Sequence, residues 1–185
     1  MGRMRERWEI LETRDALVNR WINIKAEKVR LPDGTIVDDY YVNHIRPIVH
    51  VIARTPEGLL VLTRQYKHGM RDWVLEFPAG TAEDGEDVLE AAVRELREET
   101  GYQAPRLEKI AGLAASPTTV CGTRHVYFGG NAEKIAEPTP DVTEMIELEL
   151  YSPAELREMA LNGGIVDTST IACVFLALNR LGELG

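Results

Sequence analysis

Three glutamates of one predicted helix stand at spacings that suit metal-assisted chemistry. Glu98 and Glu99 follow Glu95 by three and four residues, so a helix places the three carboxylates side by side. At about 100° per residue, Glu95 and Glu99 each fall about 20° from Val88 and therefore continue an apolar stripe. Burying such a cluster raises the pKa of each carboxyl or unfolds the helix unless positive charge compensates. A hard divalent cation provides that charge, and oxygen ligands suit Mg²⁺ or Mn²⁺.

A solvated acidic surface helix is the alternative interpretation of the same residues. Arg94 stands four residues before Glu98 and can pair with it, and glutamate-rich helices with interspersed arginines usually face solvent. The wider spacing favours the chemical interpretation. Gly80 and Glu86 precede the run RELREETGY, which begins at Arg94.

Residues 80–102 resemble the Nudix box, GX5EX7REUXEEXGU, in which U is a bulky aliphatic residue. Every fixed position is matched, and the one departure is Tyr102, where an aliphatic residue is more usual. The resemblance implies an α/β fold, the Nudix α/β/α sandwich around a mixed sheet, with a small N-terminal β-hairpin or sheet region. It also implies an enzyme, a Mg²⁺-dependent pyrophosphohydrolase whose box grips a metal-bound diphosphate.

Two upstream segments resemble those of one particular branch of the Nudix family. Residues 64–67, RQYK, and residues 76–80, EFPAG, look like the RQYR and E(L/F)PAG segments of the ADP-ribose pyrophosphatase branch and its nucleoside diphosphate sugar relatives. That branch has a proline some sixteen positions after the last box glycine, and Pro117 follows Gly101 at that distance. The glycine that usually comes next is Thr118 here, so we expect a differently shaped loop around the sugar or base. ADP-ribose, cleaved to AMP and ribose 5-phosphate, is the favoured substrate.

The resemblance assigns metal binding and support of the catalytic helix to particular residues. It gives Mg²⁺, or Mn²⁺ as a substitute, to Glu95, Glu99 and the carbonyl of Ala79. Glu98 would act on the metal directly or through water. Arg94 would support catalysis by orienting the helix.

The resemblance also implies residues that meet the water and the substrate. Glu144 matches a glutamate on a mobile loop of this branch and would orient or deprotonate the attacking water, although a surface acid at a strand edge is its alternative. Arg64 would contact a phosphate, and Glu76, Pro117 and Trp21 complete the predicted substrate-binding set. Aromatic residues that suit either stacking on a nucleobase or ordinary packing are Trp21, Tyr40, Tyr41 and Trp73.

The elements that must position these residues follow from hydrophobic period and turn residues. A hairpin is predicted around residues 21–29 and the turn at 32–34, before the main domain. The box helix is expected from about residue 84 to 100, where Gly101 ends it. The remaining predictions are strands at 47–53, 59–62, 73–77, 125–128 and 146–150, a helix between Ser152 and 163–164, and a last helix at 170–181.

Length and composition suit one catalytic domain with a small appendage. The chain has 185 residues, of which 44% are hydrophobic, enough to bury a full core. We predict an N-terminal β region at residues 1–45 and a catalytic domain at residues 46–185. The first region resembles a segment that reaches across a dimer in this branch, so a homodimer is expected.

Charge and cysteine usage limit the partners and the compartment. A net charge of -9 disfavours nucleic acid and anionic membranes as partners, because both attract basic surfaces. Cys121 and Cys173 lack CxxC spacing and are expected to be reduced thiols. No apolar run near the N-terminus has the length of a signal peptide or membrane span, so the cytoplasm is expected.

Two other functions stay open at the level of the sequence. A Nudix hydrolase for another nucleotide, such as GDP-mannose, a dinucleoside polyphosphate or an RNA 5′ end, is the nearer alternative. A non-catalytic Nudix module that senses nucleotides is the other. The intact set of box carboxylates argues against the sensor, because binding without turnover would permit the loss of at least one of them.

Overall fold

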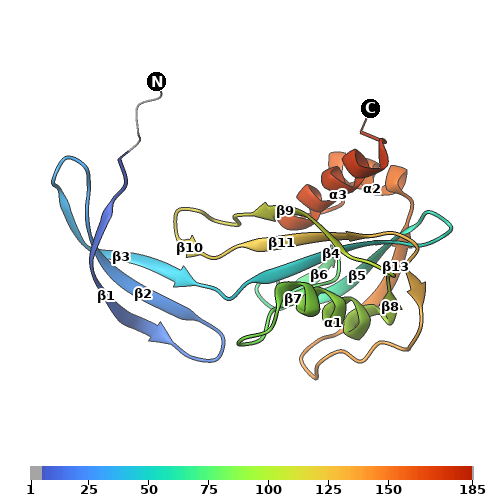
Figure 1. Ribbon diagram of the computed structural model, residues 1–185, viewed down its shortest axis with the longest axis horizontal. Coiled ribbons are helices and arrows are strands. Elements are labelled where there is room, and N and C mark those ends of the chain that lie inside the picture. Colours follow the sequence, from blue (N-terminus) through green and yellow to red (C-terminus); the bar gives the residue numbers. More distant parts are fainter. Residues whose placement is uncertain (1–5, 185) are drawn as a thin grey trace. The chain divides into compact units, whose positions relative to one another are not determined.

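The computed structural model describes residues 6–184, and its contacts divide the chain into two compact units (Figure 1). One unit comprises the chain up to Arg46 together with Ser116–Thr123. The other comprises Pro47–Ala115 and the chain from Arg124 onward. The segment Ser116–Thr123 therefore groups with the N-terminal residues, although it interrupts the second unit in sequence.

The N-terminal unit is a small sheet. β1 (Glu9–Val18), β2 (Asn23–Arg30) and β3 (Ile36–His44) form an antiparallel meander, and β10 (Val120–Cys121) adds a short parallel partner to β3. The predicted turn joins β2 to β3, with Gly34 at a φ of 88°, where an L side chain would be strained. This confirms the expected hairpin and extends it by β1.

The second unit is built on a seven-stranded mixed sheet. Its main path runs β13-β5-β4-β11-β9, with β6 paired to β5 and β7 paired to β4. The β4–β11 pairing is parallel and the other pairings in this sheet are antiparallel. The strands are β4 (Ile48–Arg54), β5 (Leu60–Lys67), β6 (Asp72–Glu76), β7 (Ala79–Thr81), β9 (Glu108–Leu113), β11 (Arg124–Gly129) and β13 (Ile146–Tyr151). A separate two-stranded sheet pairs β8 (Tyr102–Gln103) with β12 (Glu133–Lys134).

Helix α1 covers one face of this sheet. α1 (Val88–Thr100) packs Ala91, Ala92 and Leu96 on Val49 and Val51 of β4, in a cluster of fully buried side chains. Small residues on the helix bring it close to the strand. α1 therefore forms one of the two helical layers of the predicted sandwich.

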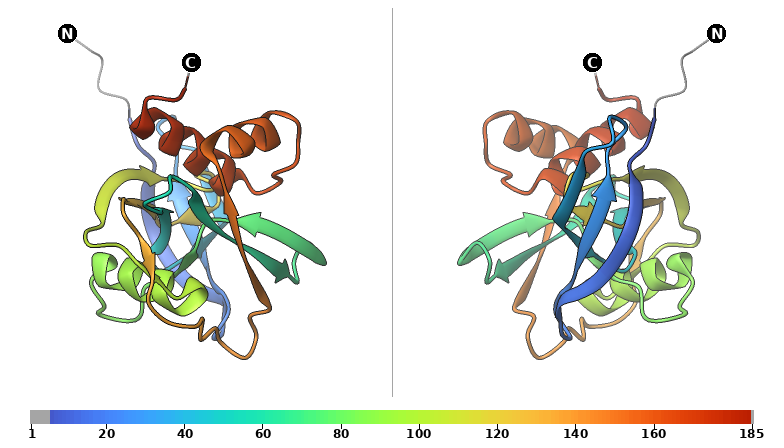
Figure 2. Two further views of the ribbon diagram at one scale, coloured as in Figure 1. Left: turned by 90° about the vertical axis from the view of Figure 1, so that its right-hand side faces the viewer. Right: turned by 90° about the vertical axis from the view of Figure 1, so that its left-hand side faces the viewer.

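Helices α2 and α3 cover the opposite face. α2 (Pro153–Leu161) and α3 (Thr168–Leu181) contribute Leu156 and Val174 to a second cluster, which includes Ile52 of β4. Neighbouring β4 residues thus point to opposite faces, as the period of two requires. Figure 2 shows α1 and the α2–α3 pair on either side of the sheet, so the predicted α/β/α sandwich is confirmed.

Several predicted boundaries were wrong by a few residues. α1 begins at Val88 and not near residue 84, because Asp87 is its N-cap and accepts the N–H groups of Leu89 and Glu90. α3 begins at Thr168 with Asp167 as its N-cap.

Within residues 6–184, no helix is both long and apolar enough to cross a membrane.

His50 of β4 is a buried titratable group on the α3 side of the sheet. Its side chain is 3% exposed, and burial followed by the charge of Arg124 lowers its pKa from 6.5 to about 4. Arg124 Nη1 lies 3.4 Å from His50 Nε2. The folded state therefore holds a neutral imidazole at neutral pH.

This burial predicts a pH-dependent stability. Because the pKa of His50 is lower in the folded state, the unfolded chain takes up the proton first as the pH falls. Above pH 6.5 the full contribution of neutral His50 to the free energy of unfolding is present. As the pH falls from 6.5 to about 4, the free energy of unfolding decreases by up to about 3 kcal/mol. Urea unfolding of the wild type and of His50→Gln from pH 7.5 to 4 checks this. The difference between their unfolding free energies should shrink with falling pH, and parallel profiles would contradict it.

Candidate active site

Helix α1 buries two of the three predicted carboxylates. Glu95 is 8% exposed and Glu99 is 2% exposed, on the same face as Ala92 and Leu96. The helix ends at Gly101, which adopts the left-handed conformation. The interpretation of α1 as a solvated acidic helix is therefore wrong for Glu95 and Glu99.

Strand β7 passes directly over these carboxylates. A Cβ placed on Gly80 would lie 2.0 Å from Cδ of Glu95, so no larger residue fits without moving that side chain. The neighbouring backbone N–H of Ala79 donates to Oε2 of Glu99 over 3.0 Å. The glycine that opens the box thus allows close approach of the strand to the helix.

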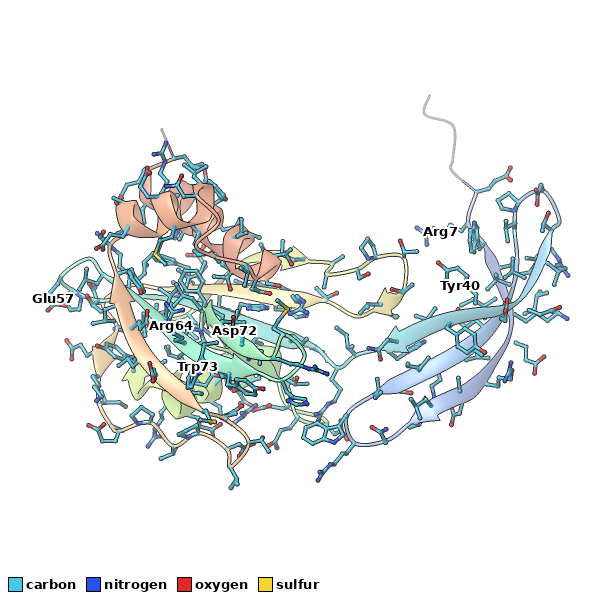
Figure 3. All side chains as sticks on the ribbon, turned by 180° about the vertical axis from the view of Figure 1, so that it is seen from behind. Arg7, Tyr40, Glu57, Arg64, Asp72 and Trp73 are labelled. Atoms are coloured by element: carbon cyan, nitrogen blue, oxygen red, sulfur yellow. The ribbon has the colours of Figure 1, made fainter. Side chains whose placement is uncertain are left out.

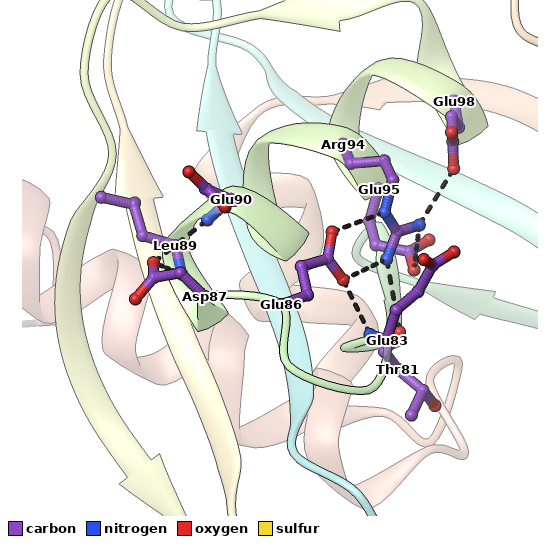
Figure 4. A network of polar contacts seen from close by, with 9 residues as sticks. All are labelled: Thr81, Glu83, Glu86, Asp87, Leu89, Glu90, Arg94, Glu95 and Glu98. Atoms are coloured by element: carbon purple, nitrogen blue, oxygen red, sulfur yellow. Dashed lines mark hydrogen bonds and ion pairs between the residues drawn. The ribbon is translucent and has the colours of Figure 1, made fainter.

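Arg94 connects the segment before α1 to the glutamates on the helix (Figure 4). Its Nε and Nη2 donate to the two carboxylate oxygens of Glu86 over 2.9 and 3.0 Å, and Nη2 also reaches the carbonyl of Thr81 over 3.3 Å. Its Nη1 donates to Glu95 over 2.9 Å and to Glu98 over 3.0 Å. The predicted pairing of Arg94 with Glu98 is confirmed. The guanidinium also lowers the pKa of Glu86 to about 2.

The buried carboxylates repel one another. Burial raises the pKa of Glu99 to about 9, and the charges of Glu76, Glu95 and Glu144 raise it further against the N–H of Ala79. Burial also raises the pKa of Glu95, although Arg94 opposes this rise. The protein's own donors therefore do not fully compensate the cost of burying these groups in their charged form.

The donor chemistry of this cluster fits a hard divalent cation. Its side-chain donors are carboxylate oxygens, which Mg²⁺ and Mn²⁺ prefer. Within residues 6–184, no three carboxylate, histidine or cysteine side chains already converge as a set of metal ligands. The reason is visible in the contacts, since Glu95 and Glu98 pair with Arg94 and Glu99 accepts the N–H of Ala79. A cation would have to exchange with these donors.

Glu144 lies within electrostatic reach of the cluster. Its charge raises the pKa of both Glu95 and Glu99. In the turn before β13, its carboxylate accepts the N–H of Asp141 over 3.0 Å, and its own N–H donates to the carbonyl of Asp141 over 2.8 Å. The structure thus brings Glu144 near the box glutamates, held by a local turn.

The predicted substrate residues of the second unit lie on two faces of the sheet. Glu76 of β6 stands opposite Thr63 of β5, is buried, and pairs with Lys67, whose ammonium is also within hydrogen-bond reach of Gln65. Sequence reasoning gave Lys67 no role, although its two-residue spacing from Gln65 places both on one strand face.

Arg64, labelled in Figure 3, alternates with these residues along β5 and shares the strand face of Leu62, which packs with α2 and α3. The guanidinium Nε lies 2.5 Å from Oε1 of Glu149, and Nη2 lies 3.1 Å from Oε2. Arg64 therefore has no contact with the box carboxylates.

Trp21 and Pro117 belong to the N-terminal unit. Trp21 is 70% exposed, with the guanidinium of Arg20 4.6 Å from its ring centroid. Pro117 lies exposed in the segment Ser116–Thr123.

A cavity of about 580 Å³ adjoins the outer side of α1. It lies within the size range of small-ligand sites. Two of its lining residues, Arg94 and Glu98, belong to the network described above. The full lining is Leu89, Glu90, Val93, Arg94, Arg97, Glu98 and Thr139.

Comparison with known protein families agrees with this geometry. The NUDIX domain model matches residues 44–168. The chain belongs to the Nudix family. Residues 8–43 match a second model, the nucleoside diphosphate sugar hydrolase N-terminal domain. The predicted family, fold class and enzyme class of this Nudix protein are confirmed.

Several relatives of this Nudix protein span most of its length. A methanol dehydrogenase activator from Bacillus methanolicus is 30% identical over 94% of each chain. An ADP-ribose pyrophosphatase from Bacillus subtilis is 32% identical over 78% of this chain and 74% of its own length. Another from Mycobacterium tuberculosis is 31% identical over 82% of this chain and 73% of its own length. The solved structure of an ADP compounds hydrolase has the same fold, with a TM-score of 0.83 at 20% identity over 98% of this chain and 100% of that one.

The contact between Gly80 and Glu95 predicts the effect of one added methyl group. In Gly80→Ala, the new Cβ displaces the Glu95 carboxylate, so affinity for a divalent cation should fall by about 10–100-fold, as when ligand-orienting contacts are lost. Calorimetric titration with Mn²⁺ measures this. Gly69→Ala is the matched control, because a Cβ there meets nothing within 4 Å. Equal Mn²⁺ affinity in Gly80→Ala and Gly69→Ala would contradict the placement of Glu95.

Proposed function

We propose that this Nudix protein hydrolyses the diphosphate linkage of a nucleoside diphosphate sugar in a Mg²⁺-dependent reaction. ADP-ribose is the favoured substrate, with AMP and ribose 5-phosphate as products. The observation that carries the proposal is the burial of Glu95 and Glu99 under Gly80, within a complete Nudix box. The match of residues 8–43 to a nucleoside diphosphate sugar hydrolase domain and the names of the two pyrophosphatase relatives support this substrate class.

The residues proposed to hold the cation are Glu95, Glu98, Glu99 and the carbonyl of Ala79. Mg²⁺ is the expected ion, and Mn²⁺ is a substitute with the same ligand preference. When bound, the ion would supply positive charge to the diphosphate and to the departing phosphate. Arg94, which holds Glu95 and Glu98, would keep both carboxylates on one side of the helix.

Glu144 is proposed to act on the attacking water. Its carboxylate would accept a proton from the water, whose oxygen forms a bond to one phosphorus atom while the bond from that phosphorus to the bridging oxygen breaks. The bridging oxygen then leaves with the other phosphate. One oxygen of this carboxylate accepts the N–H of Asp141, and the other oxygen would accept the proton of the water.

The substrate phosphates would meet cations on strand β5. Lys67 lies on the side of the sheet that carries Glu76, and its ammonium would bind a phosphate there by sharing or releasing its ion pair with Glu76. Arg64 keeps its proposed phosphate role only if the ion pair with Glu149 opens. Glu76, Trp21 and Pro117 complete the proposed substrate contacts, the last two from the N-terminal unit.

We further propose a homodimer that works in the cytoplasm. The proposed division of labour gives dimerisation to residues 1–45 and catalysis to residues 46–185. Exposed apolar side chains on the N-terminal sheet support a second copy as its partner, since such patches mark interaction surfaces. They are Trp8, Ile10, Leu11, Leu17, Val18 and Ile36. The two thiols, neither of which forms a disulfide, suit a reducing compartment.

A substrate panel tests the proposed reaction. We expect ADP-ribose to yield AMP and ribose 5-phosphate with Mg²⁺, and EDTA to abolish the reaction. Preferential turnover of GDP-mannose, a diadenosine polyphosphate or triphosphorylated RNA would replace the substrate and keep the chemistry. Saturable nucleotide binding without turnover of any panel member would contradict the proposal and favour the sensor.

Substitution of the buried Glu99 is the most specific variant test of the proposed metal site. Glu99→Gln should lower kcat on the order of 100- to 1000-fold, because it removes charge that acts in the transition state. Its fold should persist, since the raised pKa of about 9 leaves this carboxyl neutral at pH 7 without a cation. Steady-state kinetics with Mg²⁺ measures kcat, and Glu133→Gln, an exposed acid of β12, is the control. A fully active Glu99→Gln enzyme would exclude this metal site.

A further inference from the structure

Strand β13 leads directly from the turn of Glu144 into the sheet. β13 pairs with β5 along its whole length, and the N–H of Tyr66 donates to the carbonyl of Met145 over 3.3 Å. Because Met145 directly follows Glu144, the register of β13 on β5 sets where the backbone of Glu144 lies. In this register the charge of Glu144 acts on both Glu95 and Glu99. A shift of β13 along β5 would therefore change that approach.

Burial selects this register only weakly. β13 lies at the edge of the seven-stranded sheet, where β5 is its neighbour, and each of its side chains is at least partly exposed. Its sequence, IELELY, repeats one apolar and one acidic residue, so a shift of two residues returns most residue types to the same face. Such a shift moves the strand by about 7 Å. Another contact must distinguish the two registers.

Arg64 of β5 makes such a contact. It reaches diagonally across to Glu149 of β13, with Nε 2.5 Å from Oε1 and Nη2 3.1 Å from Oε2. The hydroxyl of Tyr151 donates to the same carboxylate. The side chains of Arg64 and Glu149 are 30% and 23% exposed, so this two-bond ion pair is better shielded from water than a typical surface pair. The bond from Arg64 also lowers the pKa of Glu149, which is therefore charged at neutral pH.

The contact among Arg64, Glu149 and Tyr151 is complete in one register only. Glu147 stands directly opposite Arg64, yet the guanidinium binds Glu149. After a shift of two residues, Glu147 would take the place of Glu149, and Glu149 would take that of Tyr151. A carboxylate has no proton to donate, so it would repel the paired acid where the tyrosine hydroxyl now stabilises it.

We propose that Arg64 is a positioning residue that, with Glu149 and Tyr151, fixes the register of β13 and thereby holds Glu144 beside the box carboxylates. The inference rests on the proposed function, in which Glu144 acts on the attacking water. It gives Arg64 a role that needs the ion pair closed, whereas a phosphate contact needs it open. Without the pair, β13 populates shifted registers in which Glu144 is out of reach. The rate of the chemical step falls by the fraction of molecules lost, while the groups that bind phosphate are unchanged.

The experiment compares Glu149→Gln with Glu147→Gln. Both variants remove one charge from the same face of β13, but Glu147 is exposed and has no hydrogen bond or ion pair among residues 6–184. Each substitution is also combined with Glu144→Gln. The readouts are KM and kcat for ADP-ribose with Mg²⁺, amide hydrogen exchange of residues 145–150, and the midpoint of urea unfolding.

We expect Glu149→Gln to lower kcat about tenfold at unchanged KM and to speed exchange of residues 145–150, the effect of losing a hydrogen bond between charged groups. Glu147→Gln should match the wild type in both. In the Glu144→Gln background, Glu149→Gln should lower kcat no further, because both residues act through the same carboxylate.

Three results would overturn the inference. A merely structural role of the ion pair would lower the unfolding midpoint and reduce kcat by the same factor with and without Glu144. A lower KM at unchanged kcat in Glu149→Gln would show that the freed Arg64 binds phosphate. Equal exchange of residues 145–150 in Glu149→Gln and Glu147→Gln would show that the pair does not hold the strand.

The inference and the proposed function fail in different ways. If Glu144→Gln hydrolyses ADP-ribose as fast as the wild type, the reaction stands and the inference fails. If the wild type hydrolyses no panel member, the proposed function fails, and the register is decided by the cross-strand proton contact between Leu148 and Thr63 in NMR spectra. Weakening of that contact in Glu149→Gln but not in Glu147→Gln would support the inference, and an equal contact in both would overturn it.

Discussion

The burial of Glu95 and Glu99 is the constraint on which the rest of the site depends. Two carboxyls in the apolar face of a helix destabilise it unless they are neutral, paired or bound to a cation. Here their partners are the guanidinium of Arg94 and the N–H of Ala79. A cation in the proposed metal site would compete with both partners for these carboxyl oxygens. The arrangement therefore keeps two carboxyl groups buried in a form that remains compatible with folding.

Meeting this constraint fixes the surrounding backbone. Gly80 must lack a side chain so that β7 can pass within van der Waals distance of Glu95. β7 is held by its pairing with β4, and β4 is buried on both faces between α1 and α3. The position of a few carboxylate oxygens thus depends on a sheet whose two hydrophobic clusters resist displacement. Arg94 connects this sheet edge to the helix through Thr81 and Glu86.

The sequence predicted local features of the candidate site correctly where side-chain period and chemistry agree. The helical spacing of Glu95 and Glu99 relative to Val88 predicted their burial, and the turn chemistry of Gly101 predicted the helix end. The start of α1 was misplaced because Gly85 and Asp87 form a loop and cap within an acidic stretch that has no hydrophobic period. β1 was missed because every one of its side chains is exposed, so no alternation marks it.

Other features depend on contacts between distant parts of the chain. The two-residue pairing of β10 with β3 leaves no periodic signal, and the bond from Tyr40 to Thr118 uses a backbone carbonyl that every residue type possesses. The direction of Arg64 follows from the register of β5 with β13, which short motifs do not specify. Motifs thus identified the residue types, whereas strand register decided which of them meet.

Anomalous diffraction from crystals of the wild-type protein soaked in Mn²⁺ would test the central claim most directly. We predict a Mn²⁺ peak in contact with the carboxylates of Glu95 and Glu99 and the carbonyl of Ala79, with the Arg94 bond to Glu95 lengthened or broken. A Mn²⁺ peak only elsewhere, or no peak at saturating Mn²⁺ with the Arg94 contacts intact, would contradict the claim that these buried carboxylates form the metal site.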